Sequence, residues 1–301
     1  GTRLTPHNAL FLDTFSDVSR ARSMIEALVP PPIVEHLDLE TLEGSEDHYV
    51  DENLKELESD LLFTVTLNGG ERCFVYVLVE HKSTSEHRTV FQMLRYMVRI
   101  WDKWIRDETA RRKRERKAQK GKKGDGPSTL EPKKLPAILP LVLSHARGGW
   151  KAPKCFDSLI DGPEALLEML RPTMPSFELL VEDLSQRSEE ELLALNLSHY
   201  ERLVFSLFKV VFEPDAALRF ASRRELFSEA AGEVGVGGMI RILKYTLQCL
   251  PEMNESPEDS LHWFSEAIGD PEGEVVMTMY EQLIRIGKEK GRKEGHKEGH
   301  K

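Results

Sequence analysis

The stretch from Asp60 to Lys82 constrains the fold of this chain more than any other. It contains two runs rich in β-branched, aromatic and other apolar residues, DLLFTVTL and CFVYVLVEHK, separated by NGGER. Such runs on either side of a glycine-containing turn are typical of a β-hairpin. The open end of a hairpin brings the start of one strand beside the end of the other. We therefore expect Asp60, Glu80 and Lys82 to meet there.

The register of this hairpin decides whether the three side chains share one face. Side chains alternate along a strand, so Glu80 and Lys82 project on the same side. A two-residue turn would set Asp60 opposite Val79, on the wrong face, whereas a connection one residue longer or shorter would set it opposite Glu80 or Leu78. The hypothesis of a shared site therefore predicts a connection with an odd number of residues.

The remaining apolar patterns predict an α/β fold. Apolar residues recur at helical spacing over residues 90–105, and residues 137–144 form a short apolar run typical of a buried strand. A strand, a crossover helix and a second buried strand indicate an α/β sheet. An acidic stretch, residues 43–59, leads into the hairpin. Further helices are expected over residues 5–28, 32–38, 189–197, 199–212, 239–250 and 273–286, with a linker or helix break over 232–238.

The composition divides the chain into a core, a helical portion and a tail. We expect a core over residues 1–185, a helical portion over 186–286 and a low-complexity charged tail over 287–301, in which Lys-Glu-Gly-His repeats. Within the core, residues 106–134 form a basic insert, predicted to be a frayed helix end followed by a flexible loop. This insert holds twelve Lys/Arg and five Asp/Glu, although the whole chain has a net charge of −10. Because local field governs contact with phosphate, the total charge does not exclude nucleic acid.

The compartment is predicted from what the sequence lacks. The three cysteines show no CxxC spacing, no apolar run reaches the roughly 18 residues that a membrane span needs, and the first residues show no signal-peptide pattern. We expect a cytoplasmic protein with no membrane association. The sequence leaves the oligomeric state open, with a dimer among the alternatives.

Two acidic side chains and a lysine are suited to metal-dependent phosphodiester hydrolysis. Asp60 and Glu80 offer the hard oxygen ligands that Mg²⁺ or Mn²⁺ prefers, and Lys82 could orient the nucleophile or stabilise charge on the phosphate. The alternative interpretation is that all three are solvated residues at strand ends. Against it, the run from Cys73 to Val79 is apolar at every position, which indicates a strand buried on both faces and ending at a crevice.

Several blocks of the chain resemble one known family. The segments PHNALF, YVDENL, SDLLF, VYVLVEHKS, FQMLRYMVRIW and LPLVLSHARGGW are similar to those of the YhgA-like putative transposase family, also called Rpn recombination-promoting nucleases, of the PD-(D/E)XK nuclease superfamily. The similarity covers roughly residues 6–250. It implies a three-layer PD-(D/E)XK nuclease-like core, with a mixed sheet flanked by helices. It also implies that Asp60 and Glu80 bind metal and that Asp60, Glu80 and Lys82 are catalytic.

The resemblance also implies supporting residues. Gln92 and Tyr96, four apart and hence on one helix face, match a Gln-x-x-x-Tyr element that borders the site in several superfamily members; Tyr96 could equally be a core residue. Asp51 lies in a block similar to the family's FVDEEL. Asn8 stands where relatives often carry an acidic residue, and Lys82 where they often carry glutamine. Asn8 weakens the metal site if the acidic residue of the relatives completes it, whereas Lys82 follows the pattern of the wider superfamily.

Basic residues on and after the expected helix are candidates for phosphate contact. Arg95 and Arg99 share a face with Gln92, and the insert adds a cluster of four more cations. A solvated charge run is the alternative interpretation, because the insert lacks aromatic residues for base stacking. The nucleic-acid-binding candidates are Arg95, Arg99, Arg111, Arg112, Lys113 and Arg114.

Together these features predict a Mg²⁺-dependent DNA endonuclease connected with recombination or mobile DNA. Two alternatives stay open. A catalytically decayed DNA-binding or assembly module is suggested by Asn8, and an RNA-cleaving nuclease by the fact that phosphodiester chemistry does not specify the sugar.

Overall fold

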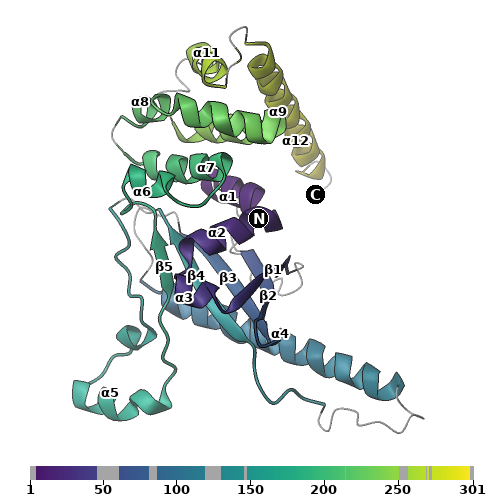
Figure 1. The fold of residues 1–301 in the computed structure, drawn as a ribbon, viewed down its shortest axis with the longest axis vertical. Coiled ribbons are helices and arrows are strands. Elements are labelled where there is room, and N and C mark those ends of the chain that lie inside the picture. Colours follow the sequence, from purple (N-terminus) through teal and green to yellow (C-terminus); the bar gives the residue numbers. More distant parts are fainter. Residues whose placement is uncertain are drawn as a thin grey trace. The chain divides into compact units, whose positions relative to one another are not determined.

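The computed structural model describes residues 5–45, 61–80, 87–118, 130–145, 148–213, 215–250, 257–268, 270 and 273–298. The chain divides into two compact units, whose elements are labelled in Figure 1. The sheet unit contains Gly1–Thr2 and Leu28–Asp183, and the helical unit contains Arg3–Ala27 and Leu184–Lys301. An N-terminal segment thus joins the helical unit, which differs from the domain division expected from composition.

Among the described residues, a five-stranded mixed sheet forms the centre of the sheet unit. Its order is β1-β2-β3-β4-β5; β1, β2 and β3 pair antiparallel, and β3, β4 and β5 pair parallel. The strands are β1 (Leu37–Gly44), β2 (Leu61–Leu67), β3 (Arg72–Glu80), β4 (Ala137–Ser144) and β5 (Leu180–Asp183). The predicted α/β class, the hairpin and the strand at 137–144 are therefore confirmed.

The hairpin between β2 and β3 has the predicted odd connection. Leu61 pairs with Val77 and Thr66 with Arg72, so residues 67–71 connect the paired positions. The Leu67 amide donates to the Glu71 carbonyl at 2.7 Å, and Gly70 adopts a φ of +90°. Only glycine adopts such a φ without strain, which explains the glycine at this position of the turn. In this register the even-numbered residues of both strands share one face of the sheet.

The core of the sheet unit lies between the even-numbered face and helix α4 (Thr89–Ala118). Phe74, Tyr76 and Leu78 from β3 pack with Met93 and Tyr96 from α4. The odd-numbered residues Cys73, Val75 and Val77 are also buried. The prediction that this strand is buried on both faces is confirmed for residues 73–78.

Helix α4 is longer than the sequence pattern predicted. It ends at Ala118, whereas the apolar spacing ends at Ile105. Residues 106–118, expected as a frayed end, are regular helix because ion pairs at i,i+3 and i,i+4 spacing continue where apolar contacts stop. Residues 119–129 lie outside the described part of the chain.

Two strands were not predicted. β1 occupies the end of the segment expected to be a short helix, residues 32–38, and the beginning of the acidic stretch, residues 43–59. Its pairing with β2 shifts between Asp38 and Glu43, and the Thr41 hydroxyl fills the irregularity by donating to the Asp38 carbonyl and accepting from the Thr66 amide. β5 has only four residues, too few for a recognisable pattern.

The helices of both units largely follow the predicted segments. The helix expected over 5–28 is two helices, because the chain turns at Ser16 and Asp17. The last helix runs through much of the expected tail, to Glu298. No described helix is long and apolar enough to cross a membrane. The remaining elements are α1 (Pro6–Phe15), α2 (Val18–Leu28), α3 (Pro31–Val34), η3 (Phe156–Leu159), α5 (Glu164–Leu170), η4 (Arg171–Thr173), α6 (Glu189–Leu193), α7 (His199–Val210), α8 (Ala216–Ala221), α9 (Arg224–Cys249), α11 (Pro257–Ala267) and α12 (Glu274–Glu298).

Gly235 interrupts α9, as predicted for the glycine-rich stretch. Its φ of 61° and ψ of −167° lie in a region that essentially only glycine adopts. We expect Gly235→Ala to lower the free energy of unfolding by about 1–3 kcal/mol in a urea titration. The matched control is Gly232→Ala in the same helix, where an added methyl group meets no atom within 4 Å. The control should be neutral or stabilising by up to about 1 kcal/mol. Equal effects of the two substitutions would contradict this account of the break.

Candidate functional site

The carboxyl ends of the three parallel strands are aligned. Glu80 at the end of β3 pairs in register with Ser144 of β4, which in turn pairs with Asp183 of β5. The Ser144 side chain is fully buried, and the Asp183 Oδ2 atom accepts a 2.6 Å hydrogen bond from the Trp150 amide. Ligands of open α/β sheets bind outside the carboxyl ends of the strands. This end of the sheet is therefore the candidate site.

Helix α4 begins at the same end of the sheet. The Tyr96 ring stacks on Tyr76, in the middle of β3, with centroids 5.1 Å apart. Further along the helix, the Trp101 Nε1 atom donates to the Pro136 carbonyl at 2.9 Å, beside the start of β4. α4 thus runs antiparallel to β3, and its first turns lie nearest to Glu80.

The two predicted helix residues differ in their surroundings. Tyr96 is buried against Tyr76, as a core residue would be, whereas Gln92 is only half-buried on the preceding turn. Core packing and a border role are compatible for Tyr96, so its part in the site stays a prediction.

The structure brings together only part of the predicted set. Asp60, Lys82 and Asp51 lie outside the described residues. Asn8 lies on α1 in the helical unit, where its side-chain oxygen is buried and has no hydrogen-bond partner among the described residues. The described residues contain no group of three His, Cys, Asp or Glu side chains that could hold a metal ion. The metal site stays a prediction.

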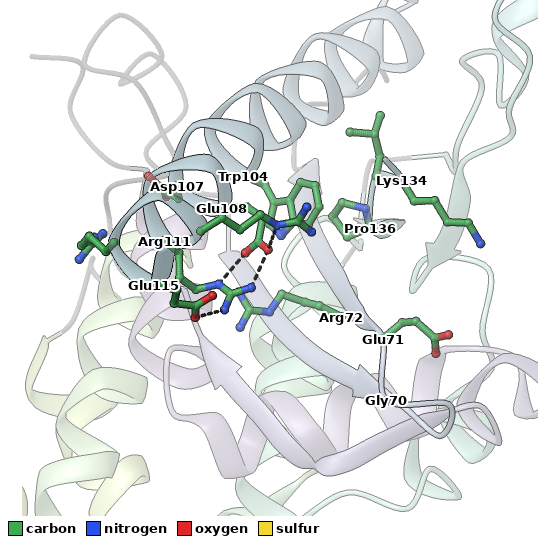
Figure 2. Close-up of a pocket in the computed structure, with 13 residues that line it drawn as sticks. Gly70, Glu71, Arg72, Trp104, Asp107, Glu108, Arg111, Glu115, Lys134 and Pro136 are labelled. Carbon is green, nitrogen blue, oxygen red and sulfur yellow. Dashed lines mark hydrogen bonds and ion pairs between the residues drawn. The ribbon is translucent and has the colours of Figure 1, made fainter. Parts of the chain in front are cut away.

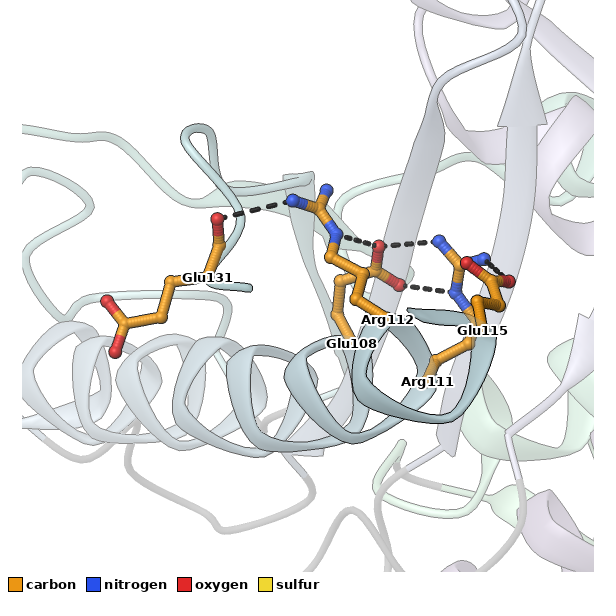
Figure 3. A network of polar contacts seen from close by, with 5 residues as sticks. All are labelled: Glu108, Arg111, Arg112, Glu115 and Glu131. Atoms are coloured by element: carbon orange, nitrogen blue, oxygen red, sulfur yellow. Dashed lines mark hydrogen bonds and ion pairs between the residues drawn. The ribbon is translucent and has the colours of Figure 1, made fainter. Parts of the chain in front are cut away.

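Arg111 and Arg112, two of the nucleic-acid-binding candidates, are engaged in a network within α4 (Figure 3). Arg111 contacts both carboxylate oxygens of Glu108, at 2.8 and 2.6 Å, and Glu115 at 2.5 Å. Arg112 donates to Glu108 at 2.8 Å and to the Glu131 carbonyl at 3.2 Å. The hydrogen bond from Arg111 is the main reason that the pKa of Glu108 falls to about 2. These two arginines are thus partly neutralised.

Lys113 and Arg114, the other two candidates in this segment, are exposed. The Arg114 Nε atom donates to the Ala110 carbonyl at 3.4 Å within the helix. Both side chains remain accessible to a phosphate.

A hollow of about 900 Å³ lies between the second half of α4, the hairpin turn and the segment before β4 (Figure 2). Arg72 and Lys134 line it together with Glu71 and the Glu108–Arg111 pair, so its charge is mixed. Arg72 and Glu80 are the first and last residues of β3. At about 3.3 Å per residue they are roughly 26 Å apart. The hollow is therefore at the opposite end of the sheet from the candidate site.

Sequence reasoning missed Ser144 and Asp183 at the candidate site. Ser144 is the last residue of a strand that was predicted correctly, so its place at the carboxyl end of the sheet could have been inferred from the sequence. Asp183 ends a strand too short to recognise, and it becomes visible only through the pairing of β5 with β4.

Comparison with known proteins gives a family match over most of the chain. The family described as "Putative transposase, YhgA-like" matches residues 5–232. Recombination-promoting nuclease RpnD of Escherichia coli O157:H7 is 32% identical over 110 residues, which are 36% of this chain and 42% of RpnD. RpnA of E. coli K12 is 35% identical over 94 residues, 31% of this chain and 32% of RpnA. No solved structure matches the chain.

A third relative is named as inactive. "Putative inactive recombination-promoting nuclease-like protein YjiP" of E. coli K12 is 33% identical over 99 residues, which are 33% of this chain and 95% of YjiP. The chain therefore covers almost all of YjiP but less than half of RpnD and RpnA.

Proposed function

Since the chain belongs to the YhgA-like putative transposase family, we propose that it is a metal-dependent nuclease that hydrolyses phosphodiester bonds in DNA. The names of RpnD and RpnA support this reaction and a connection with recombination. The observation that carries the proposal is the register of the hairpin, which pairs Leu61 with Val77. We propose that this pairing continues by one residue, which would set Asp60 opposite Leu78, on the face that alternation also assigns to Glu80.

The proposal includes a PD-(D/E)XK-like core for the sheet unit. An antiparallel hairpin is followed by a crossover helix and a parallel strand, and α4 packs on the face of β3 that carries Tyr76. This arrangement supports a layered nuclease core with its site at the end of β3.

The proposed catalytic residues divide between metal binding and assistance to the attacking water. Asp60 and Glu80 provide the carboxylate oxygens for Mg²⁺ or Mn²⁺, the hard ligands that these ions prefer. When bound, the ion lowers the pKa of a water molecule and screens the phosphate charge. Lys82 orients the attacking water and stabilises the charge that develops on the phosphate. Gln92 borders the site from the first turns of α4.

A decayed DNA-binding module is the second candidate. It is supported by the name of YjiP, by that of a further relative, "Inactive recombination-promoting nuclease-like protein RpnE", and by Asn8 in place of an acidic residue. An intact site and a decayed site differ in metal affinity. Titration calorimetry should show Mg²⁺ or Mn²⁺ binding that Asp60→Ala removes if the site is intact.

A cleavage assay tests the proposed reaction. Supercoiled plasmid and a structured RNA are incubated side by side with the protein in Mg²⁺, in Mn²⁺ and in EDTA. We expect nicking of the plasmid in the two metals and none in EDTA, because the carboxylates alone cannot activate water. Absence of cleavage in every condition, together with absence of metal binding, would favour the decayed module. Cleavage of the RNA alone would reassign the substrate.

A further inference from the structure

One face of α4 carries a line of cations along most of its length. These are Arg95, Arg99, Arg106, Lys113 and Lys117, here called the cationic track. We propose that the cationic track binds the phosphate backbone of duplex DNA next to the cut site. This inference rests on the proposed nuclease function and assigns the surface that holds its substrate.

Helical geometry places the five side chains on one face. Their spacings are four, seven, seven and four residues. At about 100° per residue, these spacings keep all five within a sector of about 40°. The buried residues Met93, Met97 and Ile100 occupy the opposite side, against the sheet. The track therefore faces away from the core. Figure 1 shows α4 running along the sheet and continuing beyond it.

The charges of the track are available to a ligand. Arg95, Arg106, Lys113 and Lys117 are exposed, and Arg99 is half-buried. No ion pair joins any of the five to another described residue, and the Arg99 Nη1 atom is buried without a hydrogen-bond partner among those residues.

The acidic side chains of α4 lie almost entirely on other faces. Glu108 pairs with Arg111 and Arg112, and Glu115 pairs with Arg111. These acidic residues are therefore neutralised by arginines outside the track, and the face of the track stays positive. Asp102 is the one acidic side chain within the face of the track, and it is exposed. The helix thus separates a paired face from a cationic face.

The length and composition of the track favour duplex DNA. From Arg95 to Lys117 the helix rises about 33 Å, close to the roughly 34 Å of one duplex turn. A stiff duplex lying along such a row presents the phosphates of both strands to it, because each strand crosses the row in turn. Phe91, one turn before Arg95, is the one exposed aromatic ring of α4, so the track offers no row of aromatic side chains of the kind on which the bases of a single strand stack.

The direction of α4 connects the track with the candidate site. Arg95 is next to Tyr96, which stacks on Tyr76 in the middle of β3, and the turns of α4 before Arg95 run on toward the carboxyl end of that strand. Lys117 is at the other end of the helix, beyond the residues that line the hollow. A duplex held along the track and extending past Arg95 therefore reaches the end of the sheet where Glu80 lies.

Binding measurements with matched variants test the track. The triple variant Arg106→Ala, Lys113→Ala, Lys117→Ala removes three exposed cations. Alanine is a good helix former, so the helix should be retained. Its control, Lys154→Ala, Lys244→Ala, Lys288→Ala, removes three exposed cations that lie outside α4 and the basic insert. Binding to a 30-base-pair DNA duplex is followed by fluorescence anisotropy in EDTA at several salt concentrations, and circular dichroism checks the helix content.

We expect the triple variant to bind at least about tenfold more weakly at 0.1 M salt. The slope of log affinity against log salt should become shallower by about 2 to 3, because each lost phosphate contact removes about 0.9. The control should stay within about twofold of the unchanged protein. Asp102→Asn should tighten binding, because it removes the negative charge from the track.

The outcomes separate this inference from the proposed nuclease function. If the triple variant bound DNA with unchanged affinity and unchanged salt slope, the proposal that the cationic track binds DNA would be refuted, even if metal-dependent cleavage were observed. The expected loss of binding in a protein that cleaves nothing would support the track and refute the nuclease. Tighter binding to a 30-base-pair RNA duplex than to the DNA would overturn the choice of DNA.

Discussion

Glu80→Ala is expected to reduce metal-dependent plasmid nicking by a factor on the order of a thousand or more. The substitution removes a proposed metal ligand, and with it the activation of water and the screening of the phosphate charge. Asp60→Ala should have a similar effect. Glu80→Gln keeps the shape of the side chain and removes its charge, so it should lose most of the activity as well. Initial nicking rates at saturating Mg²⁺ measure the effect.

The matched control for Glu80 is Glu71→Ala. Glu71 is an exposed carboxylate of the same hairpin, at the opposite end of β3. The Glu71→Ala variant should nick plasmid within about twofold of the rate of the unchanged protein, and its thermal unfolding midpoint should be the same. Nicking at the unchanged rate by both Glu80→Ala and Asp60→Ala would refute the assignment of the site. A loss of nicking accompanied by loss of folding would be assigned to structure, and calorimetry with Mg²⁺ on the folded Glu80→Gln protein would then decide.

Tyr96→Ala is expected to lower the free energy of unfolding by about 3–5 kcal/mol. The Tyr96 ring is 4% exposed and stacks on Tyr76, so its removal leaves a large cavity between α4 and the sheet. The control is Phe91→Ala on the same helix, where the ring is 46% exposed. It should cost less than about 1 kcal/mol. Urea titrations of the variants measure both effects.

Tyr96→Phe separates the two interpretations of this residue. If Tyr96 is only a core residue, the phenylalanine variant should keep nearly all of the stability and the nicking rate. If the hydroxyl group also borders the site, stability should be kept while the nicking rate falls. A stable Tyr96→Ala protein would contradict the packing described for the core.

The strongest sequence patterns predicted the centre of the sheet correctly. The runs that form β2, β3 and β4 are rich in apolar residues, and part of each run is buried in the structure. The requirement that two side chains share a face predicted the odd connection, because alternation in a strand leaves only two choices of face. The features that could be predicted were therefore either local in the sequence or fixed by the alternation of side chains along a strand.

The missed elements depend on long-range pairing or on charge. β1 reads LDLETLEG, and its acidic residues are tolerated because it lies at the edge of the sheet. β5 is recognisable only by its pairing with β4. The second half of α4 lacks an apolar face, and its ion pairs, such as Glu108 with Arg111, take the place of the core contacts that an apolar pattern indicates. Asp183 was missed with β5.

The irregular pairing of β1 also bears on how the edge of the sheet would meet a second copy of the protein. An open sheet edge exposes a row of backbone groups that a strand from another molecule can join. Here the edge is interrupted between Asp38 and Glu43, and acidic residues occur along it. A second copy approaching that edge would meet like charges and a ladder whose spacing is broken. The strand thus completes the sheet on one side while discouraging aggregation on the other.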